Sequence, residues 1–181
     1  MLVLEVRFNM VVSYTGDRDI DFLISLVKQA ELDLNAILIE IGTAKLGTTI
    51  PLAYTVPYFE IITIDTYDSP KVRSKDFDSN LQILEEYGIS NVQLVQSTSE
   101  EFGIIFEEDI DFLWIDGFHA YEVVKKDIEI WGDKLKSGCF ICGHDYSTLQ
   151  VQDAVTESVE NSNKYIDFDV FSNSIWYARK R

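Results

Sequence analysis

Continuous apolar runs and segments with apolar residues at helical spacing follow one another along the chain, and each change of pattern marks a boundary between predicted elements. Short runs of branched apolar residues are typical of strands that are buried on both faces. Such runs occupy residues 37–41, 60–64, 92–95, 112–115 and 139–142. Between them, apolar residues three and four positions apart predict helices. We expect these helices at 18–33 with Asp17 as the cap, from 48 to Pro57, at 77–87, just after residue 98, at 121–135 and near 150–161.

The last part of the chain has a different pattern. Residues 165–171 and 174–178 flank Ser172-Asn173, which predicts an antiparallel hairpin. The five preceding strand and helix pairs predict a parallel sheet with helices on both faces. The expected fold class is therefore α/β, a doubly wound and mostly parallel seven-stranded sheet that ends in an antiparallel C-terminal hairpin. We expect a single domain at 17–181 after an N-terminal arm at 1–16.

Composition narrows the kinds of partner. The chain has 181 residues, a hydrophobic fraction of 46% and a net charge of −16, with the acidic residues scattered. Binding of nucleic-acid phosphates needs clustered Lys and Arg, so no nucleic-acid partner is expected. No apolar run approaches the roughly 20 residues of a membrane span, and the first 14 residues make a poor signal peptide. We expect a cytoplasmic protein without a membrane partner, and a homo-oligomer contact through the alternating residues 2–9 of the arm.

Cys139 and Cys142 have the spacing of a metal or redox pair, but they lie on a predicted strand. Residues three apart on a strand point to opposite faces, so their sulfur atoms cannot share a bond or an ion. We interpret both as reduced structural cysteines.

Ligands of such sheets lie beyond the carboxyl ends of the parallel strands, which directs attention to the residues found there. Three of the five predicted strands have an acid at or beside this end, and both histidines of the chain lie near it. The residues at these positions are Glu40, Gly42, Asp65, Ser97, Asp116, His119, His144 and Asp145.

The first of these strands ends in a glycine-bearing turn, which is typical of a nucleotide site. Asp65 follows Gly42 by 23 residues, close to the roughly 20 expected for a carboxylate that binds a ribose diol. The dinucleotide pattern G-x-G-x-x-G is absent, because Ala44 and Leu46 occupy positions after Gly42. A ligand with a ribose but no pyrophosphate, such as an adenosyl group, fits this pattern best.

Four motifs carry a resemblance to a known family. They are Glu40-Ile41-Gly42-Thr43-Ala44-Lys45-Leu46-Gly47-Thr48-Thr49, Thr63-Ile64-Asp65, Ile115-Asp116-Gly117-Phe118-His119-Ala120-Tyr121 and Gly143-His144-Asp145-Tyr146. In this order and spacing, the chain resembles class I S-adenosylmethionine-dependent methyltransferases over roughly residues 17–179, and more narrowly their small-molecule O-methyltransferase group. Leu46 and Phe118 stand where that group usually has Gly and Asp.

The resemblance implies a role for each matched residue. Glu40, Gly42, Thr43 and Gly47 match the loop that holds the methionine part of the cofactor. Asp65 matches the ribose-binding carboxylate, while Ser97, Thr98 and Asp116 match other cofactor-binding positions. Asp116, His144 and Asp145 match the divalent-metal ligands of metal-dependent members. His119 and Asp116 match residues near the acceptor, which makes them the catalytic candidates.

The leading hypothesis is therefore methyl transfer from S-adenosylmethionine to a hydroxyl group of a small metabolite. A divalent metal or a base is needed because a neutral hydroxyl is a poor nucleophile. Carboxylates suit Mg²⁺, whereas a coordinating His144 favours Mn²⁺, Fe²⁺ or Zn²⁺, and the choice stays open. Two alternatives also stay open. One is a non-catalytic binding or assembly protein in which Leu46 blocks the cofactor, and the other is an iron-dependent hydroxylase of similar fold.

Overall fold

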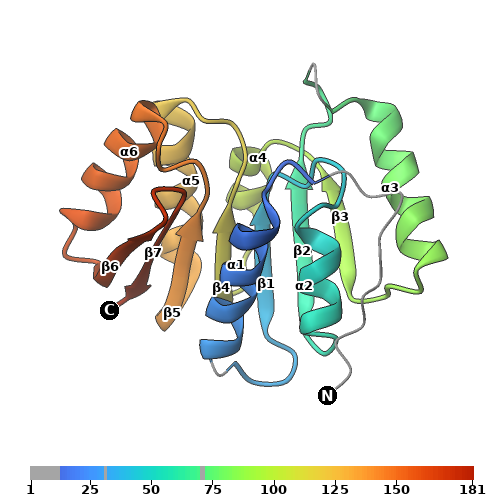
Figure 1. Ribbon diagram of the computed structural model, residues 1–181, viewed down its shortest axis with the longest axis horizontal. Coiled ribbons are helices and arrows are strands. Elements are labelled where there is room, and N and C mark those ends of the chain that lie inside the picture. Colours follow the sequence, from blue (N-terminus) through green and yellow to red (C-terminus); the bar gives the residue numbers. More distant parts are fainter. Residues whose placement is uncertain (1–12, 31, 70–71) are drawn as a thin grey trace.

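A seven-stranded sheet forms the centre of the molecule (Figure 1). The computed structural model describes residues 13–30, 32–69 and 72–181. The strand order is β3-β2-β1-β4-β5-β7-β6, with β1 to β5 parallel and β7 antiparallel to both of its neighbours. The predicted fold class is confirmed. The strands are β1 (Ile37–Ile41), β2 (Glu60–Asp65), β3 (Val92–Gln96), β4 (Ile110–Ile115), β5 (Leu135–Gly143), β6 (Tyr165–Phe171) and β7 (Ile175–Lys180).

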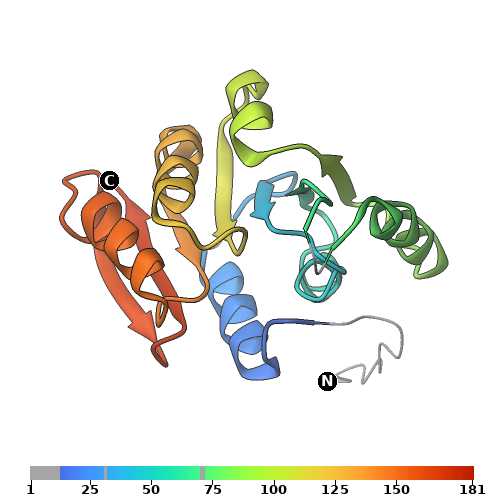
Figure 2. The ribbon, with the colours of Figure 1, turned by 90° about the horizontal axis from the view of Figure 1, so that it is seen from above.

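Helices cover both faces of this sheet (Figure 2). They are α1 (Asp17–Gln29), α2 (Thr49–Thr55), α3 (Ser74–Glu86), α4 (Ser99–Ile105), α5 (Tyr121–Lys134) and α6 (Leu149–Val155), with a π-helical turn at Thr156–Glu160. Viewed from above, α1 and α2 lie on one face, whereas α4 and α5 lie on the other. Among the described residues, no helix is long and apolar enough to cross a membrane.

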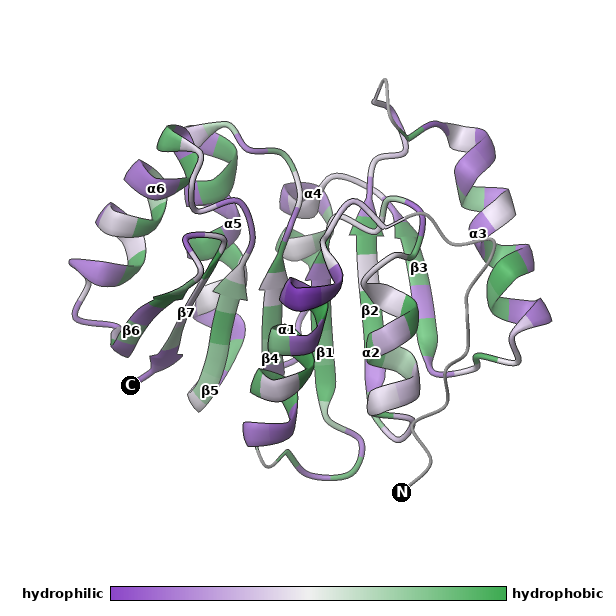
Figure 3. Ribbon diagram, in the orientation of Figure 1, coloured by the Kyte–Doolittle hydropathy of each residue, from purple (hydrophilic) through white to green (hydrophobic). Residues whose placement is uncertain are grey.

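Alternate residues of the central strands form two separate cores. Ile39 and Leu113 pack with Ile128 and Trp131 of α5, while Leu38 on the opposite face packs toward α1. The hydropathy colouring shows mostly hydrophobic residues along the central strands and a mixture of hydrophobic and hydrophilic residues on the helices (Figure 3). Both faces of the parallel sheet are buried, which explains why its strands have continuous apolar sequences rather than alternating ones.

Several predicted boundaries are wrong. The helix predicted at 18–33 ends at Gln29, and the helix predicted from residue 77 begins at Ser74. Asp17 is the first residue of α1, because the extended Gly16 is the N-cap and its carbonyl accepts hydrogen bonds from the amides of Asp19 and Ile20. The fifth strand begins at Leu135, four residues earlier than its apolar run indicates. Its first part includes the polar, exposed residues 136–138, which hydrophobicity alone assigns to a turn. The arm strand expected at residues 2–9 lies outside the described residues.

Both cysteines are free, as expected. Cys142 is fully buried between the sheet and α1, and its thiol lies 3.4 Å from the carbonyl oxygen of Leu113. Cys139 is only partly buried and packs against the opposite core. The prediction of two structural thiols on opposite faces of β5 is confirmed.

The turn after β1 is held by a close contact with the end of β4. Gly42 has a φ of +102°, and a Cβ atom there would collide with the backbone carbonyl of Asp116. The amide of Asp116 in turn donates a 2.8 Å hydrogen bond to the carbonyl of Ile41. Only glycine permits both the backbone angle and the close approach.

This contact generates a prediction for Gly42→Ala. We expect the free energy of unfolding to fall by about 2–4 kcal/mol, because the added methyl group must displace backbone atoms at a left-handed position. Urea unfolding measures the change. Gly88→Ala is the matched control, since Gly88 has a φ of +64° but no atom within 4 Å of the added Cβ. Its expected cost is only about 1 kcal/mol; equal costs for the two variants would contradict the contact.

Candidate active site

The carboxyl ends of the parallel strands place the predicted site residues in one row. Ile64 pairs with Ile41, Ile41 with Ile115, and Ile115 with Gly143. The residues that follow continue this ladder through backbone hydrogen bonds, such as the 3.0 Å bond from the amide of His144 to the carbonyl of Ile115. Across the edge the order is therefore Ser97, Asp65, Gly42, Asp116 and His144.

Glu40 lies beneath the turn that follows β1. Its side chain is fully buried, and its Oε2 accepts a 2.5 Å hydrogen bond from the hydroxyl of Thr49 at the start of α2. Its Oε1 has no hydrogen-bond partner among the described residues. Burial raises the pKa of Glu40 from 4.5 to about 7, with smaller contributions from the charges of Asp116 and Asp65. A buried acid with one unsatisfied oxygen fits a cationic group of a ligand bound above it.

Asp65 closes the turn from the β2 side. One carboxylate oxygen accepts a 2.9 Å hydrogen bond from the amide of Ala44, and the other accepts a bond of the same length from the amide of Tyr67. Each carboxylate oxygen can accept a second hydrogen bond, so a ribose diol can still bind there. The role in ribose binding stays a prediction.

Two residues that the sequence analysis missed support the same turn. Tyr67 is buried, and Asn80 of α3 donates hydrogen bonds to its hydroxyl (3.1 Å) and to the carbonyl of Ala44 (2.9 Å). Thr43 and Thr63 share a 2.7 Å hydroxyl hydrogen bond below them. In the sequence, only the position of Tyr67 two residues after Asp65 indicated that it could lie near the site. Nothing in the sequence pointed to Asn80, which is 13 residues further along the chain.

Leu46 points away from the turn. Its side chain is fully buried and packs with Ile50 of α2 and Leu84 of α3. Leu46 therefore fills a core between these helices, and the expectation that it blocks a cofactor above the turn is not supported by its position. Its φ of +64° lies in the left-handed region that glycine adopts most easily.

The segment before α1 covers the other end of the turn. A Cβ at Gly47 would collide with Ser13, and the hydroxyl of Thr15 donates a 3.0 Å hydrogen bond to Oδ2 of Asp116. Thr15 is almost completely buried. On the opposite side, Thr98 caps α4, because its hydroxyl accepts a 3.1 Å hydrogen bond from the amide of Glu101. The cofactor contacts expected at Gly47, Ser97 and Thr98 stay predictions.

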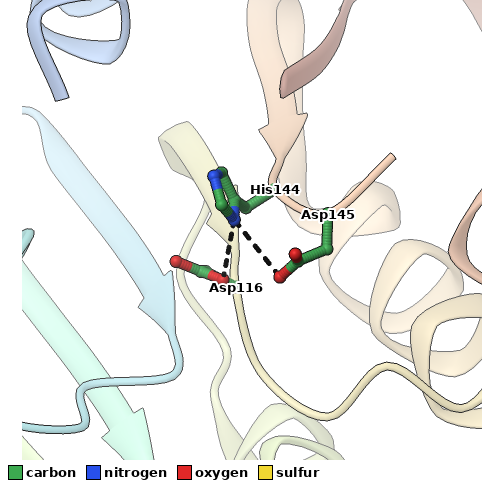
Figure 4. Close-up of side chains that lie close together, drawn as sticks. All are labelled: Asp116, His144 and Asp145. Atoms are coloured by element: carbon green, nitrogen blue, oxygen red, sulfur yellow. Dashed lines mark ion pairs between the residues drawn. The ribbon is translucent and has the colours of Figure 1, made fainter. Parts of the chain in front are cut away.

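Asp116, His144 and Asp145 converge where β4 and β5 end (Figure 4). Nδ1 of His144 lies 3.2 Å from Oδ2 of Asp145 and 3.7 Å from Oδ1 of Asp116. One ligand atom from each residue falls within 4.8 Å of the other two. The backbone of Asp145 has a φ of +57°, which turns its carboxylate back toward the histidine. The sequence-predicted metal ligands are thus brought together.

The charges of this cluster shift several pKa values. Burial alone would lower the pKa of His144, but hydrogen bonds and the charges of Asp145, Asp116 and Asp19 raise it to about 9. Burial raises the pKa of Asp116 to about 6, against the opposing effect of His144. Hydrogen bonds from His119 and His144 hold the pKa of Asp145 well below its usual range. Positive charge at Nδ1 is therefore strongly favoured.

The cluster fits a divalent cation. Two carboxylates and one imidazole nitrogen form a mixed oxygen and nitrogen donor set, which suits Mn²⁺, Fe²⁺ or Zn²⁺. Mg²⁺ could bind the two carboxylates alone, because it prefers oxygen ligands and usually keeps several waters. A cation would occupy the place where these groups now favour a proton. Because metal and proton compete for the same nitrogen, binding would be stronger at higher pH.

His119 lies at the outer side of the cluster. Its Nε2 is 3.0 Å from Oδ2 of Asp145, its side chain is 45% exposed, and the hydrogen bond to Asp145 raises its pKa. A small hollow runs from His119 and Phe118 past Asp116 and His144 to Val151 of α6 and Trp176 of β7. Phe118 is largely exposed at its rim. The volume of this hollow is about 10 Å³, so His119, at 45% exposure, is the histidine that an acceptor could reach.

Comparison with known proteins agrees with this site. A family model described as "Methyltransferase domain" matches residues 39–146, which is more than half of the chain. No curated protein matches the chain. The fold and the site define the class as S-adenosylmethionine-dependent methyltransferase, and the chain belongs to the methyltransferase-domain family.

Solved structures share the fold at low sequence identity. A Staphylococcus aureus protein assigned as a caffeoyl-CoA O-methyltransferase has a TM-score of 0.75 and 19% identity, over 94% of this chain and 86% of the other. An rRNA methylase from Streptococcus thermophilus has a TM-score of 0.67 and 17% identity, over 93% and 99%. A Streptococcus mutans protein assigned as a methyltransferase, in complex with SAH, has a TM-score of 0.67 and 17% identity, over 94% and 100%.

Glu40 generates a prediction about stability and pH. The folded protein keeps a proton on Glu40 up to about pH 7, whereas the unfolded chain releases it near pH 4.5. The folded state thus binds more protons in this interval, so its stability decreases as pH rises. Relative to Glu40→Gln, we expect the wild type to lose up to about 3 kcal/mol between these pH values.

Urea unfolding of both proteins across this pH range measures the difference. Glu60→Gln serves as the control, because Glu60 is exposed at the start of β2. The stability of Glu60→Gln should change with pH in the same way as that of the wild type. A Glu40→Gln profile parallel to that of the wild type would show that the buried carboxyl is not responsible.

Proposed function

We propose that the protein transfers a methyl group from S-adenosylmethionine to a hydroxyl oxygen of a small molecule, assisted by a divalent cation. The observation that carries this proposal is the convergence of His119, His144, Asp116 and Asp145 directly beside the Gly42 turn. Groups suited to deprotonating a hydroxyl thus lie next to the part of the fold that binds the cofactor in this family.

Residues of the turn would hold the cofactor. Glu40 offers its unsatisfied Oε1 to the cationic methionine part, and Asp65 offers its remaining lone pairs to the ribose hydroxyls. When bound, S-adenosylmethionine supplies a methyl group already activated by the sulfonium charge. The remaining task of the protein is to align an acceptor oxygen with that methyl group.

His119 is suited to accept the proton of the acceptor. It is half-exposed, and its contact with Asp145 orients the ring and stabilises the imidazolium that proton transfer creates. The cation, held by Asp116, His144 and Asp145, would supply Lewis acidity that favours the deprotonated hydroxyl. With cofactor and acceptor bound, the acceptor oxygen would form a bond to the methyl carbon as the carbon–sulfur bond breaks, and His119 would take the hydroxyl proton.

The charge of the chain favours a small acceptor over a nucleic acid. A net charge of −16 repels phosphates, and an rRNA methylase among the structural neighbours shows that the fold alone does not separate these classes. The hollow beside the cluster combines apolar walls with two histidines, but its volume of about 10 Å³ does not hold a metabolite, so the acceptor would bind over its exposed rim at Phe118 and His119.

The two alternatives lack a specific supporting observation. The non-catalytic alternative required Leu46 to block the cofactor, but Leu46 packs into the core between α2 and α3. An iron-dependent hydroxylase would use the same cluster, so we distinguish it by experiment. Iron in the purified protein, together with oxygen-dependent turnover, would favour that alternative.

Calorimetry with S-adenosylhomocysteine tests the proposal first. We expect binding by the wild type and by Asp68→Asn, which changes an exposed acid three residues after Asp65. We expect at least 10-fold weaker binding by Asp65→Asn, because its carboxylate accepts the ribose and closes the turn. No binding heat from the wild type at millimolar ligand would overturn methyl transfer.

Turnover assays with different acceptors identify the class of molecule that is methylated. Release of S-adenosylhomocysteine is followed with Mn²⁺ and a panel of phenols, catechols and sugars, with ribosomal RNA as the competing acceptor. Turnover with a small hydroxyl compound supports the proposal, whereas turnover with RNA alone contradicts it.

His119→Ala tests the proton acceptor with the best compound of that panel. We expect kcat to fall by about 10²- to 10⁴-fold, the usual contribution of a general base. The affinity for S-adenosylhomocysteine should stay close to that of the wild type, because His119 contacts Asp145 rather than the Gly42 turn. An unchanged kcat would remove His119 from the reaction.

A further inference from the structure

His144 is held on its outer side by residues from both ends of the described chain. Its Nε2 lies 3.1 Å from Oδ2 of Asp19 in the first turn of α1, and 3.0 Å from Oγ of Ser174 between β6 and β7. Ser174 also donates a 2.9 Å hydrogen bond to the same oxygen of Asp19. The three atoms form a closed triangle, and the side chains of His144 and Asp19 are only 12% and 18% exposed.

The donors in this triangle determine which nitrogen of His144 carries the proton. An ionised carboxylate only accepts hydrogen bonds, and a serine hydroxyl has a single proton to donate. Ser174 gives this proton to Asp19, so the Nε2 of His144 must donate toward Asp19 and Ser174. The neutral ring then has its free lone pair at Nδ1.

This lone pair points toward the two acids. Nδ1 faces Oδ2 of Asp145 at 3.2 Å and Oδ1 of Asp116 at 3.7 Å. Three electron-rich atoms that face one another favour a positive charge among them, which a proton on Nδ1 supplies and which a divalent cation would supply in its place. A metal-ligating histidine usually donates its other ring nitrogen to a carboxylate in this manner, which fixes the ring and makes the ligating nitrogen more basic.

Asp116 is oriented in a comparable way. Thr15, four residues before Asp19, donates to Oδ2 of Asp116 and leaves Oδ1 directed toward His144. The first turn of α1 and Thr15, two residues before this helix, thus contact two of the three cluster residues. The hairpin turn contributes the third contact through Ser174.

We propose that Asp19 and Ser174 are positioning residues for the divalent cation, because they fix the tautomer and the ring orientation of His144. This inference rests on the cation in the proposed function. Neither residue reaches the space between Asp116, His144 and Asp145, so both act through Nε2. The cation site is complete only when α1 and the C-terminal hairpin are both docked on β5.

Asp19→Asn tests this role most sharply. An asparagine amide can donate to Nε2, which would shift the ring proton to Nδ1 and place it where the cation binds. We expect the affinity for Mn²⁺, measured by calorimetry without cofactor or acceptor, to fall by about 10- to 100-fold. Ser174→Ala should weaken binding in the same direction but less, because Asp19 remains.

Asp21→Asn is the matched control. It removes the same charge from the same helix, but Asp21 is exposed and lies two residues beyond Asp19. Its Mn²⁺ affinity should equal that of the wild type. The pulsed electron paramagnetic resonance signal of bound Mn²⁺ should show imidazole nitrogen in the wild type and in Asp21→Asn, and a weaker nitrogen coupling in Asp19→Asn. A purely structural role would lower thermal stability without this selective change.

The outcomes of these measurements distinguish the positioning role of Asp19 and Ser174 from the cation site itself. If the wild type binds Mn²⁺ and Asp19→Asn binds it equally well with the same nitrogen coupling, the positioning role is wrong and the cation site stands. If the wild type binds no Mn²⁺, both the positioning role and cation assistance are wrong. Binding of S-adenosylhomocysteine then still tests methyl transfer by itself. Should Asp19→Asn fail to fold, Ser174→Ala decides, since an unchanged affinity there overturns the proposal.

Discussion

The close approach of Gly42 to the backbone of Asp116 sets the distance between the turn after β1 and the cluster at the ends of β4 and β5. A side chain at position 42 would push these two parts of the edge apart. Methyl transfer requires donor and acceptor in a narrow geometry, and small displacements lower the rate strongly. The contact of a glycine with a carbonyl is therefore the constraint on which the two halves of the site depend.

Buried charge is the second feature that organises the site. Glu40, Asp116 and Asp145 are acids close to one edge of the sheet, and burial raises the pKa of the first two. Such acids are unfavourable for folding unless a positive charge accompanies them. His144 and His119 supply part of it, and a cation and a cationic cofactor would supply the rest. The arrangement is better suited to binding positive ligands than to stabilising the empty protein.

The sequence was sufficient for the sheet and its active edge, because both follow from local patterns. Apolar runs locate β1 to β4 within two residues, and the carboxyl-end rule then brings Asp65, Asp116 and His144 together. Contacts between distant segments have no such pattern. Thr15 and Asp116 are 101 positions apart, and Asp19 and Ser174 are 155 apart. Leu46 was misjudged for a related reason, since its direction depends on the left-handed backbone of the turn.

The most direct test is a crystal structure of the protein grown with Mn²⁺ and S-adenosylhomocysteine, with the metal located by its anomalous scattering. We expect one strong peak within bonding distance of Asp116, Asp145 and Nδ1 of His144, and we expect the ribose hydroxyls to bind Asp65. A peak elsewhere, or a His144 ring that presents Nε2 to the metal, would contradict this expectation.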